Sequence, residues 1–296
     1  MLELTRLLSL ASECGFDAAG VARAHRLDED AAILEQWLQL KHHGSMEYMT
    51  RDFEKRVNPE ALVPGSRSVV VCLMSYHKNR RQTTGAPFIS QSGLSKTDYH
   101  LVIKNHLMEL EKRITEAYGE EVFSSTHQHL FCDSAPILER RWAQLAGLGW
   151  IGKNRQLINP QLGSYIHIGI LLLNREINQY SQPFEEDLCH DCNLCLKACP
   201  TGALRAQPFD ARKCIAYLTI ERKEPLPQKY KKLVKNVLYG CDRCAEACPY
   251  NLQVGPTSHE ELMANEDVLD MTAEEWAATS RRQKIKYLHR LAKNDE

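Results

Sequence analysis

The sequence lacks the features that mark membrane proteins, secreted proteins and strongly charged nucleic-acid-binding proteins. Its 37 Lys and Arg residues nearly balance 38 Asp and Glu, so the formal net charge is −1. Any nucleic-acid contact must therefore depend on a local basic patch. The longest apolar run, residues 168–173, is far too short to cross a bilayer. Residues 1–6 lack the basic segment and apolar core of a secretory signal, and we therefore expect a cytoplasmic protein.

Cysteine, in contrast, is frequent, with 11 in 296 residues. In a reducing compartment such a number favours metal ligation over disulfides. Eight of the cysteines fall into two runs and one isolated position between the runs. The other three, Cys14, Cys72 and Cys132, are expected to be buried small side chains, because free cysteine behaves as a small hydrophobe.

The two cysteine runs follow the spacing of bacterial ferredoxins. Residues 189–200 fit C-x₂-C-x₂-C-x₃-C-P, whereas residues 241–249 form a shorter copy in which Leu238 stands where the first cysteine is expected. In two-cluster ferredoxins the fourth cysteine of a run binds the other cluster. The pattern therefore predicts two 4Fe-4S clusters, one ligated by Cys189, Cys192, Cys195 and Cys248, the other by Cys199, Cys214, Cys241 and Cys244. Structural zinc usually uses paired C-x₂-C knuckles, so zinc and disulfides are the less favoured alternatives.

Two other patterns resemble binding motifs. Residues 147–152 match G-x-G-x-x-G, but they follow a helix pattern and the position about twenty residues on, near Leu172, is apolar rather than acidic. We expect a glycine-bent loop there, not a dinucleotide site. His127 and His129 project from the same face of an expected strand, so a metal pair is conceivable. Two imidazoles without a third ligand are more often packing or surface histidines.

The remaining sequence predicts a mixed α/β (α+β) fold. Apolar periodicity indicates helices over residues 4–14, 28–43, 97–118 and 136–145, with Asp28 capping the second and Thr97 or Asp98 capping the third. In the second helix the expected core face consists of Ile33, Trp37 and Leu40, flanked by Leu34 and Leu38. Strands are expected over residues 68–74, 122–132 and 163–173. Residues 78–95 are polar and too long for a turn, and we expect a mobile flap.

Basic residues are concentrated in two segments near the second cysteine run. The first spans residues 222–236, where Glu224 is the single acidic side chain. The second lies in the tail and follows an acidic stretch over residues 260–275. Such runs are usually solvated surface, but beside a redox centre they could bind phosphates. The residues concerned are Arg222, Lys223, Lys229, Lys231, Lys232 and Lys235 in the first segment, and Arg281, Arg282, Lys284, Lys286, Arg290 and Lys293 in the second.

Four blocks together resemble the epoxyqueuosine reductases, cobalamin-dependent iron–sulfur enzymes that complete queuosine in tRNA. The blocks are residues 133–140 (Asp-Ser-Ala-Pro-Ile-Leu-Glu-Arg), 146–154 (Ala-Gly-Leu-Gly-Trp-Ile-Gly-Lys-Asn), 189–200 and 240–251. The resemblance covers most of residues 1–256. It implies a nitroreductase-like cobalamin domain over residues 1–180, a ferredoxin-like domain with two clusters over 181–256 and a helical tail over 257–296. It also implies a short form without the helical-repeat domain that family members often carry.

The resemblance also implies a mechanism in which a low-potential donor, whose identity the sequence does not reveal, feeds electrons through the clusters to cobalamin. Co(I) would then attack the epoxide, and Asp133 would protonate the departing oxygen. An unperturbed aspartate is ionised at neutral pH, so this role requires burial against the corrin to raise the pKa of Asp133. Alternatively, Asp133 caps the helix expected from Pro136.

For cobalamin we expect contacts from a few polar side chains and from the backbone around Cys241. Phosphates of the tRNA anticodon loop are expected to bind the basic segment over residues 222–235. Two other functions remain open: a reductive-dehalogenase-like cobalamin enzyme acting on a small organic substrate, and a two-cluster electron-transfer protein. The expected cobalamin contacts are Arg56, Tyr99, Asp133, Lys153, Asn154 and Asp242.

Overall fold

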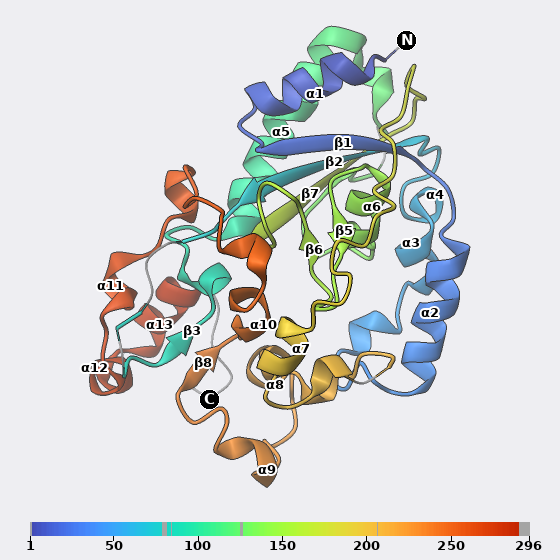
Figure 1. The fold of residues 1–296 in the computed structure, drawn as a ribbon. Coiled ribbons are helices and arrows are strands. Elements are labelled where there is room, and N and C mark those ends of the chain that lie inside the picture. Colours follow the sequence, from blue (N-terminus) through green and yellow to red (C-terminus); the bar gives the residue numbers. More distant parts are fainter. Residues whose placement is uncertain (1, 79–81, 84, 125–126, 206, 290–296) are drawn as a thin grey trace.

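The fold is centred on a four-stranded antiparallel sheet in the order β1-β2-β7-β4 (Figure 1). The structure, a computed structural model, describes residues 2–78, 82–83, 85–124, 127–205 and 207–289. Mixed helices and strands were predicted from the sequence, and this fold class is confirmed. The strands of the sheet are β1 (Ala18–Arg23), β2 (Ser68–Ser75), β7 (Ile166–Leu173) and β4 (Leu130–Phe131).

Both faces of the central sheet are covered, which explains why its middle strands read as continuous apolar runs. All eight residues of β2 are buried, and successive side chains alternate between two cores. Val70 and Cys72 face the core formed with α1 (Leu4–Glu13) and α5 (Tyr99–Tyr118). Val69 and Val71 face the opposite core, which contains Trp142 of α6 (Glu139–Leu145).

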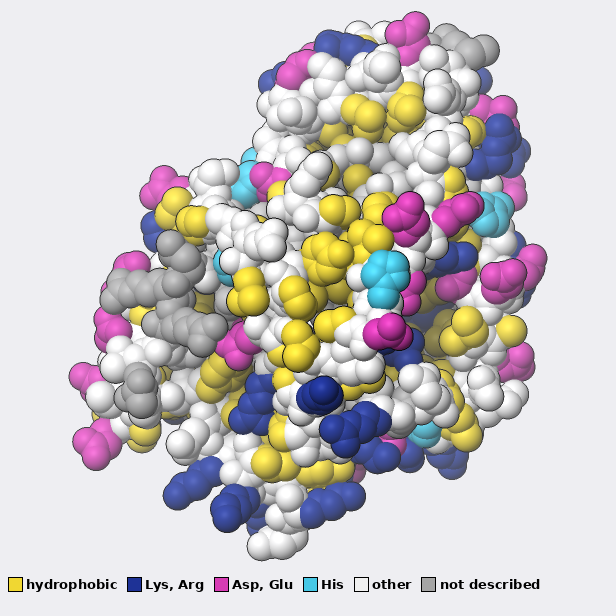
Figure 2. Space-filling view, in the orientation of Figure 1, with side chains coloured by type: hydrophobic (Ala, Val, Ile, Leu, Met, Phe, Trp, Pro, Cys, Tyr) yellow, Lys and Arg dark blue, Asp and Glu magenta, His cyan; other side chains and the backbone are white. Residues whose placement is uncertain are grey.

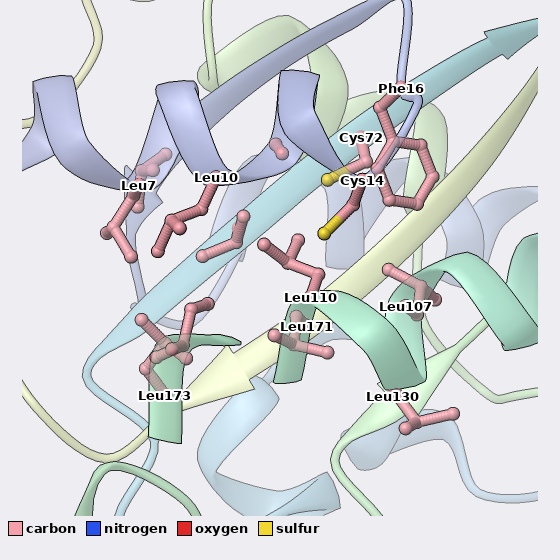
Figure 3. Packing of buried hydrophobic residues seen from close by; sticks show 14 of the residues in the cluster. Leu7, Leu10, Cys14, Phe16, Cys72, Leu107, Leu110, Leu130, Leu171 and Leu173 are labelled. Carbon is pink, nitrogen blue, oxygen red and sulfur yellow. The ribbon is translucent and has the colours of Figure 1, made fainter. Parts of the chain in front are cut away.

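The core between α1, α5 and the sheet holds all three cysteines outside the runs, and Figure 3 shows Cys14 and Cys72. Cys14 and Cys72 lie among the leucines of both helices, and neither is more than 6% exposed. Cys132 is 8% exposed. Burial raises the pKa of all three thiols. The prediction that these cysteines are buried small side chains is therefore confirmed.

Helix α2 (Asp28–Gln39) forms where expected but packs through a different stripe. Ile33 is 62% exposed and Leu40 is 45% exposed, so the prediction that they face the core was wrong. Ala31 and Leu34 are buried instead. Two sets of apolar residues in this segment have helical spacing. The sheet covers the set that runs from Leu27 through Ala31 to Leu34, because these residues belong to one core cluster with the strands. Asp28 lies inside the helix and caps nothing.

The predicted strand over residues 122–132 is mostly absent from the described residues. Residues 120–122 form a 3₁₀ turn, and only Leu130–Phe131 pair with β7. Residues 125–126 lie outside the described part of the chain. The polar residues between the two ends do not alternate with apolar ones, so no sheet face is available for them to bury.

Residues 78–95 were expected to form a mobile flap, but their described part is attached to the cysteine region. Strand β3 (Phe88–Ile89) pairs in parallel with β8 (Val237–Tyr239), and Ser90 N donates to Tyr239 O. Residues 79–81 and 84 of this segment lie outside the described residues. This pairing brings the flap segment beside the second cysteine run.

Short helices dominate the rest of the chain. In the described residues, no helix is long and apolar enough to span a membrane. A small hairpin, β5 (Trp150–Ile151) and β6 (Leu157–Ile158), precedes the cysteine region. The remaining α-helices are α3 (Phe53–Val57), α4 (Pro59–Leu62), α7 (Leu194–Ala198), α8 (Ile215–Ile220), α9 (Gln228–Lys231), α10 (Arg243–Glu246), α11 (Glu266–Leu269), α12 (Ala273–Ala278) and α13 (Arg281–Leu288). The 3₁₀ turns are Glu47–Met49, Gln91–Leu94, Glu120–Val122, Ala203–Arg205, Ala211–Lys213, Pro249–Asn251 and Glu260–Leu262.

Candidate functional site

Two cavities are lined by the cysteines that the spacing grouped together. The smaller, which we call the Cys189 cavity, has a volume of about 140 Å³. The larger, the Cys199 cavity, has a volume of about 320 Å³. The structure therefore brings together the two predicted crossed sets: Cys189, Cys192, Cys195 and Cys248 line the first cavity, and Cys199, Cys214, Cys241 and Cys244 line the second.

The chemical state of these cysteines suits a multi-iron cluster. All eleven cysteines are free of disulfides, so the disulfide alternative is wrong. Among the described residues, no three His, Cys, Asp or Glu side chains are arranged around a single metal ion. Burial raises the pKa of Cys241 to about 11 and of Cys244 to about 12. Ligand binding as thiolates therefore requires a strongly positive centre and releases protons.

Lys153 and Asn154 were expected to contact cobalamin, but the structure places them at the cysteine cavities. The Lys153 Nζ donates to the carbonyl oxygens of His190 (2.6 Å) and Cys192 (3.1 Å). Asn154 is 3% exposed and lines both cysteine cavities. Lys153 therefore supports the loop that carries the first cysteine run. Asn154 Oδ1 instead accepts from Gln156 N, and Asn154 Nδ2 has no hydrogen-bond partner among the described residues.

The glycine-rich stretch over residues 147–152 is a bent loop, as predicted. Gly149 has φ +143°, and a Cβ there would lie 2.1 Å from Ile158 O. The close approach lets β5 pair with β6. Trp150 on β5 then donates its Nε1–H to Cys189 Sγ over 3.3 Å. The loop thus packs the first part of the chain against the Cys189 cavity.

Asp133 lies where two further cavities meet, which we call the inner and outer Asp133 cavities. The inner cavity is about 160 Å³ and the outer about 510 Å³. Asp133 follows β4 and has φ +59°. Its Oδ2 accepts a hydrogen bond from Tyr99 Oη at 2.6 Å and lies 3.4 Å from His100 Nε2. Its backbone N donates to Glu139 Oε1 at 2.5 Å.

The alternative role of Asp133 as a helix cap was wrong. Helix α6 begins at Glu139, and its first residue is preceded by Leu138, which makes no capping hydrogen bond. The Asp133 side chain instead points to residues from α5. This arrangement leaves the carboxylate available for chemistry at the junction of the two cavities.

The pKa values around Asp133 are shifted from their ordinary values. The hydrogen bond from His100, followed by that from Tyr99, holds the pKa of Asp133 well below its ordinary range and outweighs burial. The side chain is 61% exposed, which further limits the effect of burial. The rise in the Asp133 pKa was expected from burial against a corrin, and it stays a prediction. Burial raises the pKa of neighbouring Glu139 to about 7, with a further contribution from the negative charge of Asp133.

Four aromatic rings are stacked beneath Asp133. His167 stacks on Tyr76 at a centroid distance of 4.2 Å and on Tyr99 at 4.0 Å, and Tyr99 stacks on His100 at 4.0 Å. His167 is 8% exposed, and its Nε2 has no hydrogen-bond partner among the described residues. Burial lowers the pKa of His167, so this ring is neutral at physiological pH.

Sequence reasoning missed His100, Glu139 and His167. His167 carried a usable signal, because it is an isolated polar residue in an otherwise apolar strand. His100 and Glu139 carried none, since their importance depends on contacts with Asp133 across 33 and 6 positions of the chain. Their roles follow from the tertiary arrangement alone.

The Asp133 cavities adjoin the Cys199 cavity. Arg140 and Gln156 line both the inner Asp133 cavity and the Cys199 cavity, and Glu221 lines both the outer Asp133 cavity and the Cys199 cavity. Among the described residues, the Cys189 cavity shares Asn154 with the Cys199 cavity and no lining residue with either Asp133 cavity. The three sites therefore lie in the order Asp133, Cys199, Cys189.

Two more of the expected cobalamin contacts lie in different environments. Arg56 is 8% exposed and lines the outer Asp133 cavity, where its Nη2 donates to Tyr48 O and its Nε has no partner among the described residues. Asp242 accepts a hydrogen bond from Gln91 N at 2.6 Å. Burial raises the pKa of Asp242 to about 7. Arg56 thus shares a cavity with Asp133, whereas Asp242 is occupied by the flap segment.

The basic segment over residues 222–235 surrounds α9 and forms a patch beside the cysteine region (Figure 2). Lys232 and Lys235 join Arg243 and Cys241 in lining a surface cavity of about 460 Å³. In the tail, the basic side chains on α13 include Lys284, whose Nζ lies 5.4 Å from the centroid of the Trp276 ring. Arg290 and Lys293 lie outside the described residues.

Among the described residues, His127 and His129 belong to no group of three or more side chains that could hold a metal ion. His129 Nε2 lies 2.8 Å from Glu111 Oε1, and its ring stacks on Phe123 at 4.6 Å. His127 Nδ1 lies 3.4 Å from Ser124 Oγ. The two imidazoles thus have separate partners, as expected of packing and surface histidines.

Comparison with family models gave two matches in this chain. A model described as epoxyqueuosine reductase QueG matches residues 56–134. A model described as a 4Fe-4S double cluster binding domain matches residues 188–251. The first ends just after Asp133, and the second contains all eight cysteines of the two cavities.

Known proteins similar to this chain include a curated epoxyqueuosine reductase from Leadbetterella byssophila, 41% identical over 90% of this chain and 85% of the relative. A solved epoxyqueuosine reductase with a tRNA-Tyr epoxyqueuosine-modified stem loop is 27% identical, with TM-score 0.83, 97% of this chain and 75% of the other covered. A second solved epoxyqueuosine reductase, from Bacillus subtilis, is 27% identical with a TM-score of 0.79. The match covers 97% of this chain and 75% of the Bacillus subtilis chain. Its aspartate-bearing catalytic loop is described as swung out of the active site.

Proposed function

The chain belongs to the epoxyqueuosine reductase family, and we propose that it reduces epoxyqueuosine to queuosine in the anticodon loop of tRNA. It is an oxidoreductase with a 4Fe-4S double-cluster domain. In this proposal two clusters relay electrons, cobalamin is the second cofactor and Asp133 lies in the proton path. The observation that carries it is the adjacency of the Asp133 and Cys199 cavities through Arg140, Gln156 and Glu221.

The proposed cluster ligands are the two crossed cysteine sets. Their grouping around separate cavities supports this assignment, and so does the double-cluster match over residues 188–251. Since the Cys189 cavity is remote from Asp133, electrons from a low-potential donor would enter there and leave through the Cys199 cavity. Lys153 would hold the first cysteine run in place along this path.

Cobalamin suits the chemistry of the outer Asp133 cavity. Arg56 contributes a buried donor without a partner among the described residues, and the amide side chains around a corrin ring offer acceptors for it. When bound, cobalamin supplies a metal centre able to deliver electrons to an epoxide carbon. We keep Arg56, Tyr99 and Asp133 as its contacts. Lys153 is engaged at the Cys189 cavity and Asp242 by the flap segment, and we assign both to positioning the clusters. Asn154, whose buried Nδ2 has no partner among the described residues, stays a proposed contact.

Removal of the epoxide oxygen consumes two electrons and two protons and leaves an alkene and water. Asp133 is the proposed donor to the departing oxygen, because its carboxylate lies at the mouth of the inner cavity and is oriented by Tyr99 and His100. The aspartate-bearing catalytic loop of the Bacillus subtilis relative supports this role.

The proposed substrate is a tRNA with a queuosine-type anticodon. The support is the solved relative that holds an epoxyqueuosine-modified tRNA stem loop, together with the basic patch beside the cysteine cavities. Lys232, Lys235 and Arg243 would contact phosphates of the loop. Such contacts steepen the salt dependence of binding, since each neutralised phosphate releases counterions.

The function can be tested by anaerobic turnover of an epoxyqueuosine-containing tRNA. Protein reconstituted with iron, sulfide and cobalamin is reduced chemically, incubated with the tRNA, and the nucleosides are identified by mass spectrometry. The proposal expects queuosine to appear while epoxyqueuosine disappears. Intact clusters and bound cobalamin without any loss of epoxyqueuosine would contradict it.

A further inference from the structure

The low pKa of Asp133 raises the question of where its proton is stored. His100 and Tyr99 both stabilise the ionised carboxylate, so Asp133 by itself holds no proton at neutral pH. A general acid nevertheless needs a proton at the moment of bond cleavage. An imidazole can hold a proton and release it near neutral pH. The imidazole of His100 lies beside Asp133, with its Nε2 3.4 Å from Asp133 Oδ2.

His100 is held in a defined orientation by Asp98. Asp98 is the N-cap of α5, where its Oδ1 accepts from His100 N at 2.9 Å. The same oxygen lies 2.7 Å from His100 Nδ1. A carboxylate at Nδ1 keeps that nitrogen protonated and turns Nε2 toward Asp133. Stacking of Tyr99 on the ring at 4.0 Å restricts it further.

We propose that His100 is the proton reservoir of this site: anchored at Nδ1 by Asp98, its imidazolium passes the Nε2 proton through Asp133 to the oxygen that leaves the substrate. The inference rests on the proposed function and deepens it. The proton for the departing oxygen comes from a relay of Asp98, His100 and Asp133, not from Asp133 alone. His100 touches neither the substrate nor the cofactor in this scheme. It acts through Asp133 and is a positioning and proton-storing residue.

The protons and electrons of the relay balance as follows. Two electrons from the clusters reduce the substrate as both C–O bonds of the epoxide break and the C=C bond forms. The departing oxygen takes one proton from Asp133 to become a hydroxyl group and a second proton to leave as water. In each transfer Asp133 receives the proton of His100 as it donates one to the oxygen, and it is a carboxylate again afterwards. His100 then recovers a proton from solvent, to which 33% of its side chain is exposed. The relay therefore operates twice in each turnover.

The charges around His100 favour storage of a proton near neutral pH. The hydrogen bond to Asp133 raises the pKa of His100 most, burial opposes the rise, and Asp98 adds to it. Glu139 and Arg140 on α6 also act on this group, Arg140 through Asp133 and Glu139. Further titratable neighbours are His167 on β7, Lys78 beside His167, and His289 after α13, which acts on Asp98. Because the pKa is raised, the relay holds its proton below that pKa and loses it as pH rises through it.

The first test measures the titration of His100 without relying on turnover. Carbethoxylation of His100 by diethylpyrocarbonate is followed by peptide mass spectrometry across pH 5–9, since the reagent attacks the unprotonated ring. The wild-type protein should give an apparent pKa above the ordinary histidine value. Asp133→Asn should lower it by about one unit or more, because an opposite charge is removed. Equal titration of His100 in both proteins would overturn the relay.

The second test measures single-turnover reduction by the reconstituted enzyme. His100→Gln should slow the reaction about 100-fold and abolish the alkaline decline in rate that accompanies His100 deprotonation. His100→Ala should be partly rescued by added imidazole, an effect that a merely structural histidine does not give. His106→Gln, on the same helix but hydrogen-bonded to Cys14 O, is the control for disturbance of α5. Iron content and tRNA binding should be unchanged in every variant.

The outcomes separate this inference from the proposed function. If the wild-type enzyme fails to reduce epoxyqueuosine, the proposed function fails and the relay for this reaction falls with it. If the wild type is active but His100→Gln keeps the wild-type rate and pH profile, the relay alone is overturned. A slowed His100→Gln whose pH profile keeps its alkaline decline would also overturn the relay, since the histidine would then be structural.

Discussion

The cysteine cavities and the Asp133 cavities obtain their residues in different ways. Seven of the eight cysteines come from two short runs, 189–199 and 241–248, and only Cys214 is supplied from elsewhere. The inner Asp133 cavity combines residues from β2's end, α5, the β4–α6 loop and β7, including Tyr76, Tyr99, Asp133 and His167. A metal cluster can be built from local spacing, whereas acid–base chemistry here depends on how the whole sheet packs.

The largest expected effect concerns the crossing of the two cysteine sets. Cys199→Ser, in the first run, and Cys244→Ser, in the second, should remove the same cluster, lower bound iron from about eight to about four per chain, and abolish reduction. Cys192→Ser and Cys248→Ser should both remove the other cluster. Iron analysis and electron paramagnetic resonance of the reduced proteins distinguish the two pairs.

Cys14→Ala is the control for this experiment, because Cys14 is buried in the α1–α5 core and lines neither cysteine cavity. It should retain both clusters. If Cys199→Ser and Cys192→Ser instead removed the same cluster, each run would ligate its own cluster and the crossing would be wrong.

The next effect concerns the Asp133 cavities. Asp133→Asn keeps the size of the side chain but cannot carry the proton, so reduction should slow by about 10²–10⁴-fold. Cluster content and tRNA affinity should not change, since Asp133 lines neither cysteine cavity. Single-turnover kinetics with mass-spectrometric detection of queuosine measure the loss.

Exposed Asp267 on α11 offers the matched control, and Asp267→Asn should react at the wild-type rate. Undiminished reduction by Asp133→Asn would remove this residue from the mechanism. The comparison would then also fail, because proton transfer would not depend on the residues that distant elements bring together around Asp133.

Glu139 should make a smaller contribution, visible in stability. Its pKa is raised to about 7 in the folded protein, so the folded state binds a proton that the unfolded state has lost. Stability therefore falls as pH rises from the ordinary carboxyl range to about 7. Glu139→Gln removes this titration and should be more stable than wild type at pH 8, by roughly 1–2 kcal/mol after allowance for partial exposure.

Thermal unfolding of both proteins at several pH values measures this difference. The two stability curves should converge toward pH 5, where Glu139 is protonated and resembles glutamine. A constant offset between the curves at all pH values would mean that Glu139 does not titrate in this range.

The smallest expected effect concerns the basic patch. Lys232→Ala combined with Lys235→Ala should weaken tRNA binding at physiological salt and reduce the slope of log affinity against log salt by roughly one to two. The rate of reduction of bound tRNA should be unchanged. Lys112→Ala on α5, remote from this surface cavity, is the control. An unaltered salt slope would exclude the patch as the phosphate contact.

The features of the fold and site that could be predicted from the sequence are those that depend on residues close together in the chain. The crossed cysteine sets follow from spacing, because cluster ligands are close in sequence. The predicted core face of α2 was centred on Ile33, with Leu34 at its flank, whereas the structure buries Leu34 and exposes Ile33. The two stripes have the same periodicity, and only packing against the sheet decides between them. The lowered pKa of Asp133 could not be predicted, since it depends on His100, brought close by the packing of α5 beside β4.

The most direct test of the central claim is single-turnover reduction of epoxyqueuosine-modified tRNA by protein that carries both clusters and cobalamin and has been reduced before mixing. The account predicts about one queuosine formed per chain, with the rate declining as pH rises through the His100 titration. A fully loaded, tRNA-bound protein that leaves the epoxide intact at every pH would contradict it.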